Sequence, residues 1–356
     1  MPEKYLIIPF FIPHIGCPYK CIFCSQKKIT GRESPVTPED ILPTIHRYLK
    51  TLPQDRRKVE IAFYGGSFTG IPEDLQTSFL EAAVSAKSRG LVDGIRLSTR
   101  PDYIDKRILE RLKKYRVDAI ELGVQSMDNQ VLKKSLRGHT AEDVLIASKL
   151  IQREGFVLGL QMMIGLPGSN LKKDIETARQ ICEIKPRMVR IYPALVIRGT
   201  ALEALYKKGN YRPLSLEKAV DTCTVLAEMF MRENISIIRM GLQPTELINK
   251  GGEVVAGPFH AAFRQLVDSR LVKKAVNKAM DQRELGRVPA ITVEVSPGTV
   301  SALQGIKKES IAALLEEYPG LSIKIVQNSA LDKTAIRFFY ESSMFEIDYR
   351  EVLIKG

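Results

Sequence analysis

Cysteine is scarce in this chain, with five residues among 356. So small and odd a number makes a disulfide framework, as found in small secreted proteins, a poor interpretation. Long apolar runs are also missing, because no stretch reaches the roughly 18 residues of a membrane-spanning helix. The first residues lack a small-residue cleavage site, and Pro9 and Pro13 interrupt their apolar run. We therefore expect a soluble cytoplasmic protein with reduced thiols and no membrane partner.

Acidic residues are outnumbered, since 41 Asp and Glu face 53 Lys and Arg, for a formal net charge of +12. Lys and Arg neutralise phosphates with release of counterions, so this excess suits a polyanion such as nucleic acid. A solvated basic surface without such a partner explains the same number, because net charge governs non-specific association and not fold. Both interpretations stay open at this point.

Three of the five cysteines stand within eight residues: Cys17, Cys21 and Cys24. Their C-x3-C-x2-C spacing offers three soft sulfur ligands, which is typical of iron–sulfur clusters and zinc sites. Cys182 and Cys223 lie in apolar helical patterns, where cysteine behaves as a small hydrophobe. The spacing therefore predicts a metal centre with three protein thiolates. A structural zinc site with His14 as the fourth ligand is the alternative.

The residues from 5 to about 238 alternate between short β-rich runs and longer amphipathic segments. Apolar runs bounded by turn or polar residues predict strands at 5–10, 59–65, 94–99, 119–124, 156–165 and 188–197. Apolar residues three and four apart predict helices at 73–90, 107–115, 142–155, 171–184 and 215–234. Six consecutive βα units predict an α/β fold with a parallel sheet wrapped by helices.

The pattern changes beyond residue 240. Residues 241–259 are rich in glycine and predict a loop, and residues 261–287 predict a basic helix that could face RNA. A short α/β module follows, with strands at 290–298, 321–327 and 335–341 and a helix at 307–319. We therefore predict two domains, 1–240 and 241–356, the second with a role in nucleic-acid binding or as a small α/β cap.

The cysteine loop CPYKCIFC resembles the cluster loop of radical S-adenosylmethionine (SAM) enzymes. The resemblance implies a partial (β/α)6 radical SAM barrel with a C-terminal helical and small α/β extension. It also implies a [4Fe-4S] cluster on the three close cysteines, with SAM at the open iron. In that family an electron from a donor such as ferredoxin or flavodoxin passes through the cluster and cleaves SAM to a 5′-deoxyadenosyl radical. Phe23, between the second and third cysteines, would shield the cluster.

Further motifs follow the predicted strands, at the end of a parallel barrel where ligands bind. The stretch FYGGSFTG, with Gly65, Gly66 and Ser67, is similar to the glycine motif that receives the SAM amino group, although a tight turn is the alternative. Arg100, in the turn LSTRPDY, suits a bidentate carboxylate. A salt bridge with Asp102 explains Arg100 equally well.

The later strands add polar side chains. Glu121 and Gln125 interrupt an apolar run, and buried polar groups need partners. The resemblance puts Gln125 near the SAM ribose and Arg137, from LRGHT, near its carboxylate; a helix cap is the alternative for Arg137. It puts Gln161 and Tyr192, at the fifth and sixth strands, beside the adenine and the reaction chamber.

The ordered motifs GGSFTG, TRPDY, ELGVQS, RGHT and IYPALVIRGT resemble the radical SAM domain of the Elongator catalytic subunit, a tRNA wobble-uridine modifying enzyme. Oxygen-independent coproporphyrinogen oxidase is a more distant likeness. The first cysteine interval is shorter here, and we find no acetyl-CoA phosphate loop after these motifs, so the resemblance leaves the reaction product open. It implies SAM cleavage and RNA, above all tRNA, as the substrate.

Two other functions stay open from the sequence. One is a radical SAM enzyme for a small porphyrin-like carboxylate, and the other is a non-catalytic iron–sulfur or zinc protein that binds nucleic acid. Residues 303–326 are loosely like a K-homology module, whose GxxG turn clamps backbone nucleotides. Lys308 replaces the second glycine of that turn.

Overall fold

The structure is a computed structural model, and it describes residues 5–12, 17, 21–25, 36–51, 58–245, 248–249 and 251–354. His14, the alternative zinc ligand, lies outside the described residues. Contacts group the chain into two compact units, Met1–Leu214 with Ile235–Phe259 and Ser215–Asn234 with His260–Gly356. The domain boundary after residue 240 stays a prediction. The grouping adds that residues 215–234 associate with the later part of the chain.

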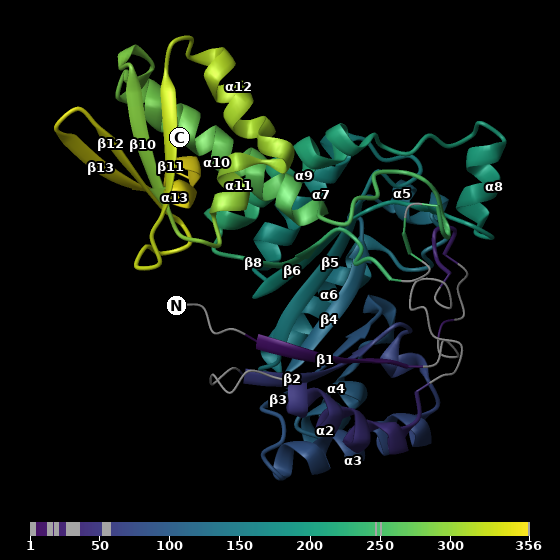
Figure 1. Cartoon of the computed structure of the whole chain (residues 1–356). Coiled ribbons are helices and arrows are strands. Elements are labelled where there is room, and N and C mark those ends of the chain that lie inside the picture. Colours follow the sequence, from purple (N-terminus) through teal and green to yellow (C-terminus); the bar gives the residue numbers. More distant parts are fainter. Residues whose placement is uncertain are drawn as a thin grey trace. The chain divides into compact units, whose positions relative to one another are not determined.

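A seven-stranded sheet forms the centre of the first unit (Figure 1). Its order along the sheet is β1 (Tyr5–Phe11), β2 (Lys58–Tyr64), β3 (Gly94–Thr99), β4 (Ala119–Gln125), β5 (Val157–Ile164), β6 (Met188–Pro193) and β8 (Ser236–Met240). Every neighbouring pair is parallel. The predicted α/β fold with a partial barrel is thus confirmed, and β8 extends the six predicted strands by a seventh.

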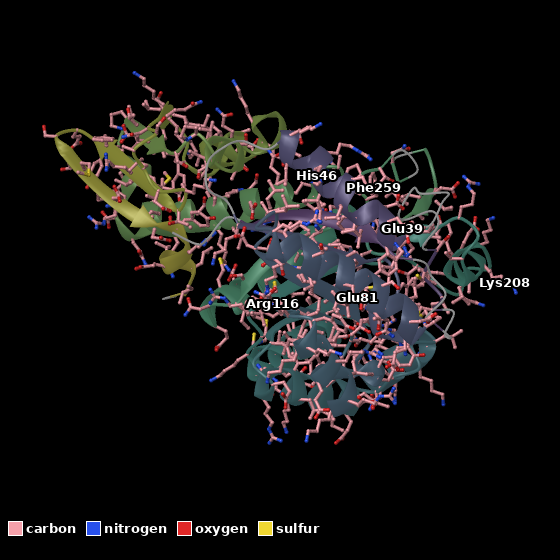
Figure 2. The ribbon with its side chains drawn as sticks, turned by 90° about the horizontal axis from the view of Figure 1, so that it is seen from below. Glu39, His46, Glu81, Arg116, Lys208 and Phe259 are labelled. Atoms are coloured by element: carbon pink, nitrogen blue, oxygen red, sulfur yellow. The ribbon has the colours of Figure 1, made fainter. Side chains whose placement is uncertain are left out.

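Helices follow the strands and pack on the sheet. They are α2 (Ile41–Thr51), α3 (Glu73–Ser88), α4 (Lys106–Lys114), α5 (Asn129–Lys134), α6 (Ala141–Arg153), α7 (Leu171–Ile184) and α8 (Ala201–Lys207), with short 3-10 turns at Pro38–Asp40, Phe68–Gly70 and Pro101–Tyr103. Helix α6 packs on β4 and β5, and α7 packs on β5. Helices α2 and α3 are in contact, and the labelled His46 and Glu81 mark them in Figure 2. Thr140 is the N-cap of α6 and forms a capping box with Asp143 in the first turn of the helix.

The two faces of the sheet differ in chemistry because side chains alternate along a strand. In β2, Ile61 and Phe63 are fully buried, and the Phe63 ring lies 5.7 Å from that of Phe79 on α3. Glu60 and Tyr64, which alternate with them along the strand, face the opposite, inner side of the sheet. That inner face carries polar and charged groups from several strands.

The predicted strand at 188–197 divides at Pro193, because proline cannot donate to a sheet ladder. Its second part becomes β7 (Val196–Ile197), which pairs antiparallel with β9 (Val254–Ala256). The prediction of a loop throughout 241–259 is therefore wrong at β9. No helix in the described ranges is long and apolar enough to cross a membrane.

The second unit has its own four-stranded sheet, in the order β11 (Ser322–Gln327), β10 (Ala290–Val295), β12 (Ala335–Tyr340) and β13 (Ser343–Asp348). Strands β10 and β11 are parallel and the other pairs antiparallel. Its helices are α9 (Leu216–Arg232), α10 (Phe263–Gln282), α11 (Val300–Gln304), α12 (Glu309–Glu317) and α13 (Tyr349–Ile354), with 3-10 turns at Leu285–Arg287 and Ile306–Lys308. Val272 and Met280 of α10 pack with Val293 and Phe338 in one apolar core.

The predicted basic helix is α10, and most of its cations have partners within the second unit. Lys274 Nζ lies 2.7 Å from a carboxylate oxygen of Glu228, and Lys278 Nζ donates to the Val352 carbonyl at 3.0 Å. Arg270 pairs with Asp221 at 3.3 Å. This pairing weakens the expectation that α10 presents an unpaired basic face. The Gly305–Lys308 turn joins α11 to α12, and the K-homology-like role of this turn stays a prediction.

Candidate active site

The predicted site residues follow the strands at the same edge of the parallel sheet. Gly65 comes directly after β2, Arg100 directly after β3, and Gln125 is the last residue of β4. Gly65 has φ +99°, and a Cβ there would lie 3.3 Å from the Ile12 carbonyl oxygen. Glycine is therefore required where β2 passes the end of β1.

Backbone hydrogen bonds hold the short turn that carries Cys21 and Cys24. The Cys24 N–H donates to the Cys21 carbonyl at 3.0 Å, and between them the Ile22 N–H donates to the Ser135 carbonyl at 3.2 Å. The Ile22 carbonyl in turn accepts from the Leu202 N–H at 2.8 Å. Cys21 is buried and Cys17 and Cys24 are half-buried. Within the described ranges, no three His, Cys, Asp or Glu side chains converge closely enough to hold a metal ion, so the ligand set stays a prediction.

Two arginines support the cysteine turn, one by direct contact and the other through the first. Arg137 donates from Nη1 to Cys21 Sγ at 3.3 Å and from Nη2 to the Gly123 carbonyl at 2.7 Å, so its side chain does not cap a helix. Arg100, 1% exposed, donates from Nη2 to the Arg137 carbonyl at 2.6 Å. It also forms the alternative salt bridge, with both Asp102 oxygens at 2.9 Å. Arg100 thus supports the backbone of Arg137.

The pKa of Arg100 shows how polar its surroundings are. Burial acts to lower this pKa, but the hydrogen-bonded carboxylate of Asp102 and the nearby thiols of Cys17 and Cys21 raise it above the usual value.

The end of β4 brings three predicted polar groups together. Gln125 has φ +66°, and the register against β5 shifts between Gly123 and Gln125. This bulge turns Gln125 toward Gln161, whose Nε2 donates to Gln125 Oε1 at 3.2 Å. A Cβ at Gly123 would lie 2.8 Å from both Arg137 Nη2 and Gln125 Nε2, so only glycine leaves room for this arrangement.

Aromatic side chains border the same region. Phe23, from the cysteine turn, and Tyr192, from β6, both pack on an apolar cluster that includes Met163 and Leu166. Ser67 is buried and precedes the short helical turn after β2. Gly65, Gly66 and Ser67 lie at the β1–β2 side of the edge, whereas Tyr192 lies at the β6 side.

A charged network crosses the inner face of the sheet. Glu121, 4% exposed, lies at its centre, with one carboxylate oxygen 3.1 Å from Arg96 Nη1 and the other 2.6 Å from Arg190 Nε. Arg96 also donates from Nε to Glu60 at 2.7 Å. The Tyr64 hydroxyl donates to Glu121 at 3.2 Å and accepts from Arg190 Nη2. The partners expected for Glu121 are thus found on three other strands.

Burial acts on every ionisable group of this network, together with the charges of its neighbours. It raises the pKa of Tyr64 above the usual phenol value, and the negative charge of Glu121 adds to the effect. Burial also raises the pKa of Glu60, against the opposing charge of Arg96. Burial acts to lower the pKa of Arg190, but Glu121 and Tyr64 reverse that and raise it. Both arginines therefore stay charged, and Tyr64 stays protonated.

The sequence interpretation missed Arg96 and Arg190 and assigned no role to Glu60. Each stands in an apolar strand segment, which was a signal that could have identified them. Gly123 was also missed, although a glycine inside a strand often marks a close approach.

Asp174 is buried beneath the turn Gly165–Ser169 that follows β5. Ser169 Oγ donates to Asp174 Oδ1 at 2.5 Å, and the Gly165 N–H donates to Oδ2 at 3.2 Å. Burial raises the pKa of Asp174 to about 6, although both hydrogen bonds lower it.

We expect the Asp174→Asn variant to remove a pH-dependent loss of stability. Well below pH 3.8 the carboxyl is protonated in both states; as pH rises, it ionises first in the unfolded chain, near 3.8, and in the folded chain near 6. Between these values ionisation favours unfolding, so wild type should lose about 2 to 3 kcal/mol relative to Asp174→Asn between about pH 4 and pH 7. Urea unfolding of both proteins across this range measures the difference. A difference that does not change with pH would contradict the assignment.

Two protein-family models match the chain, the radical SAM superfamily over residues 11–181 and the radical SAM C-terminal domain over residues 186–273. The model of the superfamily includes the cysteine turn and the strand ends up to β5. The model of the C-terminal domain begins just before β6.

The chain is 30% identical over 245 residues to a tRNA uridine(34) acetyltransferase of Methanocaldococcus jannaschii, covering 58% of this chain and 45% of that protein. It is 30% identical over 286 residues to human Elongator complex protein 3, covering 74% of this chain and 50% of that protein. The chain thus spans about half the length of the curated relatives it matches. The solved structure of an archaeal Methanocaldococcus infernus Elp3 with an N-terminal deletion has the same fold, with a TM-score of 0.60 and 23% identity over 80% of this chain and 64% of that chain. The chain therefore belongs to the radical SAM superfamily of enzymes, which use a [4Fe-4S] cluster and SAM, and it is homologous to the radical SAM region of Elongator complex protein 3.

Proposed function

We propose that this chain binds a [4Fe-4S] cluster through Cys17, Cys21 and Cys24, cleaves SAM reductively and modifies RNA, with tRNA as the substrate. The observation that carries the proposal is the hydrogen bond from Arg137 to Cys21 at the carboxyl ends of the strands. It puts a carboxylate-binding side chain beside a predicted cluster ligand.

The residues present suit both cofactors. Three thiols within eight residues, with the guanidinium groups of Arg100 and Arg137 nearby, are a donor set for an iron–sulfur cluster. Arg137 Nε is buried and has no hydrogen-bond partner among the described residues. A buried donor of this kind calls for an acceptor, and the SAM carboxylate is a suitable one.

Each side chain then has a defined task. The cluster, when bound, supplies the electron that cleaves SAM, and a donor such as ferredoxin or flavodoxin replaces that electron. Arg137 holds the carboxylate and Arg100 positions Arg137. The amide of Gln125 offers hydrogen bonds to the ribose, and the amide of Gln161 offers them beside the adenine. Phe23 and Tyr192 supply apolar contacts that exclude water from the reacting groups.

The RNA substrate is supported by the relatives, one of which is named a tRNA uridine(34) acetyltransferase, and by the net charge of +12. Mass spectrometry of tRNA nucleosides from a strain lacking this gene, beside its parent, tests the proposal. We expect one modified nucleoside to disappear and to return with wild-type protein but not with Cys21→Ala. Unchanged tRNA, combined with 5′-deoxyadenosine formation by the purified protein, would instead indicate a small-molecule substrate.

A further inference from the structure

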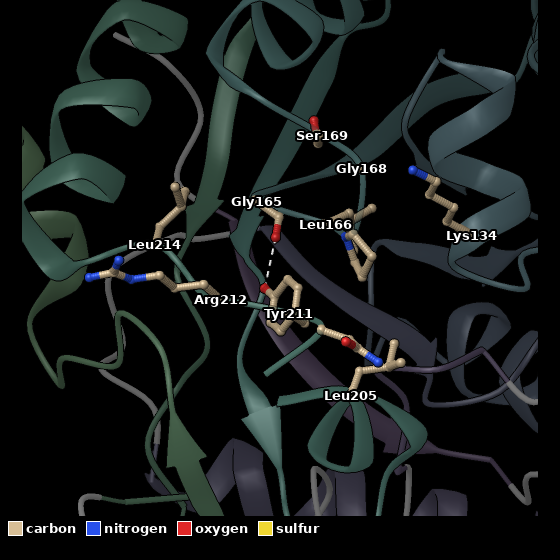
Figure 3. A pocket seen from close by; sticks show the side chains of 11 residues that line it. Lys134, Gly165, Leu166, Gly168, Ser169, Leu205, Tyr211, Arg212 and Leu214 are labelled. Carbon is tan, nitrogen blue, oxygen red and sulfur yellow. Dashed lines mark hydrogen bonds between the residues drawn. The ribbon is translucent and has the colours of Figure 1, made fainter. Parts of the chain in front are cut away.

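A pocket of about 420 Å³ lies in the first unit, beside the turn that follows β5 (Figure 3). Its walls come from the Gly165–Ser169 turn, from Lys134 at the end of α5, from Leu205 on α8 and from the segment between Asn210 and Leu214. None of the residues predicted to bind the cluster or SAM lines it. The pocket therefore has room for a second ligand.

Two glycines in the turn Gly165–Ser169 let other side chains approach its backbone closely. Gly165 and Gly168 have positive φ values of +71° and +80°. A Cβ at Gly168 would lie 3.1 Å from Lys134 Nζ, and one at Gly165 would lie 2.8 Å from a methyl carbon of Leu214. The Tyr211 hydroxyl donates to the Gly165 carbonyl at 2.8 Å and fixes the opposite wall. The Lys134 amine thus lies directly against the turn.

The charge of the pocket is positive. Its charged lining residues are Lys134 and Arg212, which lie at opposite ends in Figure 3, and no carboxylate lines it. Both side chains are exposed, and neither has an ion-pair partner among the residues that the structure describes. Lys207, on the neighbouring helix α8, pairs instead with Glu203 at 2.9 Å. Two uncompensated cations separated by apolar surface suit a ligand with phosphates at both ends of a less polar body.

The pocket adjoins the cysteine turn. Leu205 packs on the cluster that contains Ile22, and Leu166 belongs to the cluster on which Phe23 packs. A ligand in the pocket would therefore lie beside the turn that carries Cys21 and Cys24.

We propose that this pocket binds a nucleotide unit of an RNA strand, with its phosphates at Lys134 and Arg212 and its ribose or base against Leu205. The proposal rests on the proposed RNA substrate and names where the strand is held. In this proposal, the residues that bind the RNA strand are different from the residues that bind SAM and the cluster.

The test is RNA binding by the full chain with Lys134→Gln and Arg212→Gln combined. We expect the affinity for tRNA to fall at least about tenfold, because hydrogen bonds to charged groups are lost. The slope of log affinity against log salt should fall by about 1.5, since two phosphate contacts are removed. In wild type, bound tRNA should protect the Lys134 amine from an acylating reagent.

The matched control is Lys149→Gln with Arg153→Gln. Lys149 and Arg153 are exposed on α6, which packs on β4 and β5. Their substitution removes the same net charge as the pocket variant does. The control should bind tRNA like wild type. If the pocket variant also binds like wild type, or if Lys134 stays reactive under bound tRNA, the pocket proposal is overturned and the proposed function stands. If wild type binds no tRNA, the proposed RNA substrate fails, and the pocket proposal with it.

Discussion

Replacing Cys21 with alanine should abolish both the iron content of the anaerobically reconstituted protein and its cleavage of SAM. Cys21 is the buried member of the three-cysteine set and the one that Arg137 contacts at 3.3 Å. Two thiolates do not hold a corner-open cluster, because a second iron would then lack its protein ligand. Iron analysis, the visible absorption spectrum and 5′-deoxyadenosine formation measure the loss. We expect the same result from Cys17→Ala and Cys24→Ala.

Cys182→Ala and Cys223→Ala are the matched controls for the cysteine series. Cys182 is on α7 and Cys223 is fully buried on α9, both within helical packing. These variants should keep the cluster and the SAM cleavage of wild type, even where the lost sulfur lowers stability. If wild-type protein contains zinc and no iron after anaerobic reconstitution, the cluster proposal is wrong.

Replacing Glu121 with alanine should lower the free energy of unfolding by about 3 to 5 kcal/mol, because it leaves buried charges without their partner. Arg190 would keep hydroxyl partners alone, from Tyr64 and, at 3.4 Å, from Tyr192. Arg96 would keep Glu60. Thermal unfolding followed by calorimetry measures the change, and at this chain length the midpoint should fall by roughly 5 °C.

Glu176→Ala is the control for this measurement. Glu176 also pairs with an arginine, Arg179 at 2.7 Å, but on the surface of α7 with 46% of its side chain exposed. Exposed ion pairs contribute little because water and salt screen them. We expect almost no shift for Glu176→Ala. An equally small shift for Glu121→Ala would mean that the inner-face network relaxes or admits water.

The inner-face network and the strand-end site are distinct in chemistry. Around Glu121 both arginines pair with a carboxylate, whereas Arg137 at the strand ends has no carboxylate partner among the described residues. The first arrangement stabilises the concave face of the sheet. The second is suited to a ligand.

Local patterns in the sequence were sufficient for the α/β alternation and for the three-cysteine motif. A strand shows its apolar run within about six residues, and a metal loop shows its ligands at short spacing, so both signals are present without knowledge of the fold. The sequence also predicted that Gly65, Arg100 and Gln125 lie at the same edge of the sheet, because the carboxyl ends of parallel strands lie at one edge.

Tertiary structure alone decided which side chains meet. Arg137 reaches Cys21 across 116 residues, and Arg190 reaches Glu121 across 69. Such pairs depend on sheet register and on the bulge at Gln125, which displaces one strand against the next. The pocket at Lys134 likewise joins segments from α5, the β5 turn and residues 210–214. Periodicity reports which face of its own element a residue occupies, but the neighbour across that face is set by the packing of distant segments.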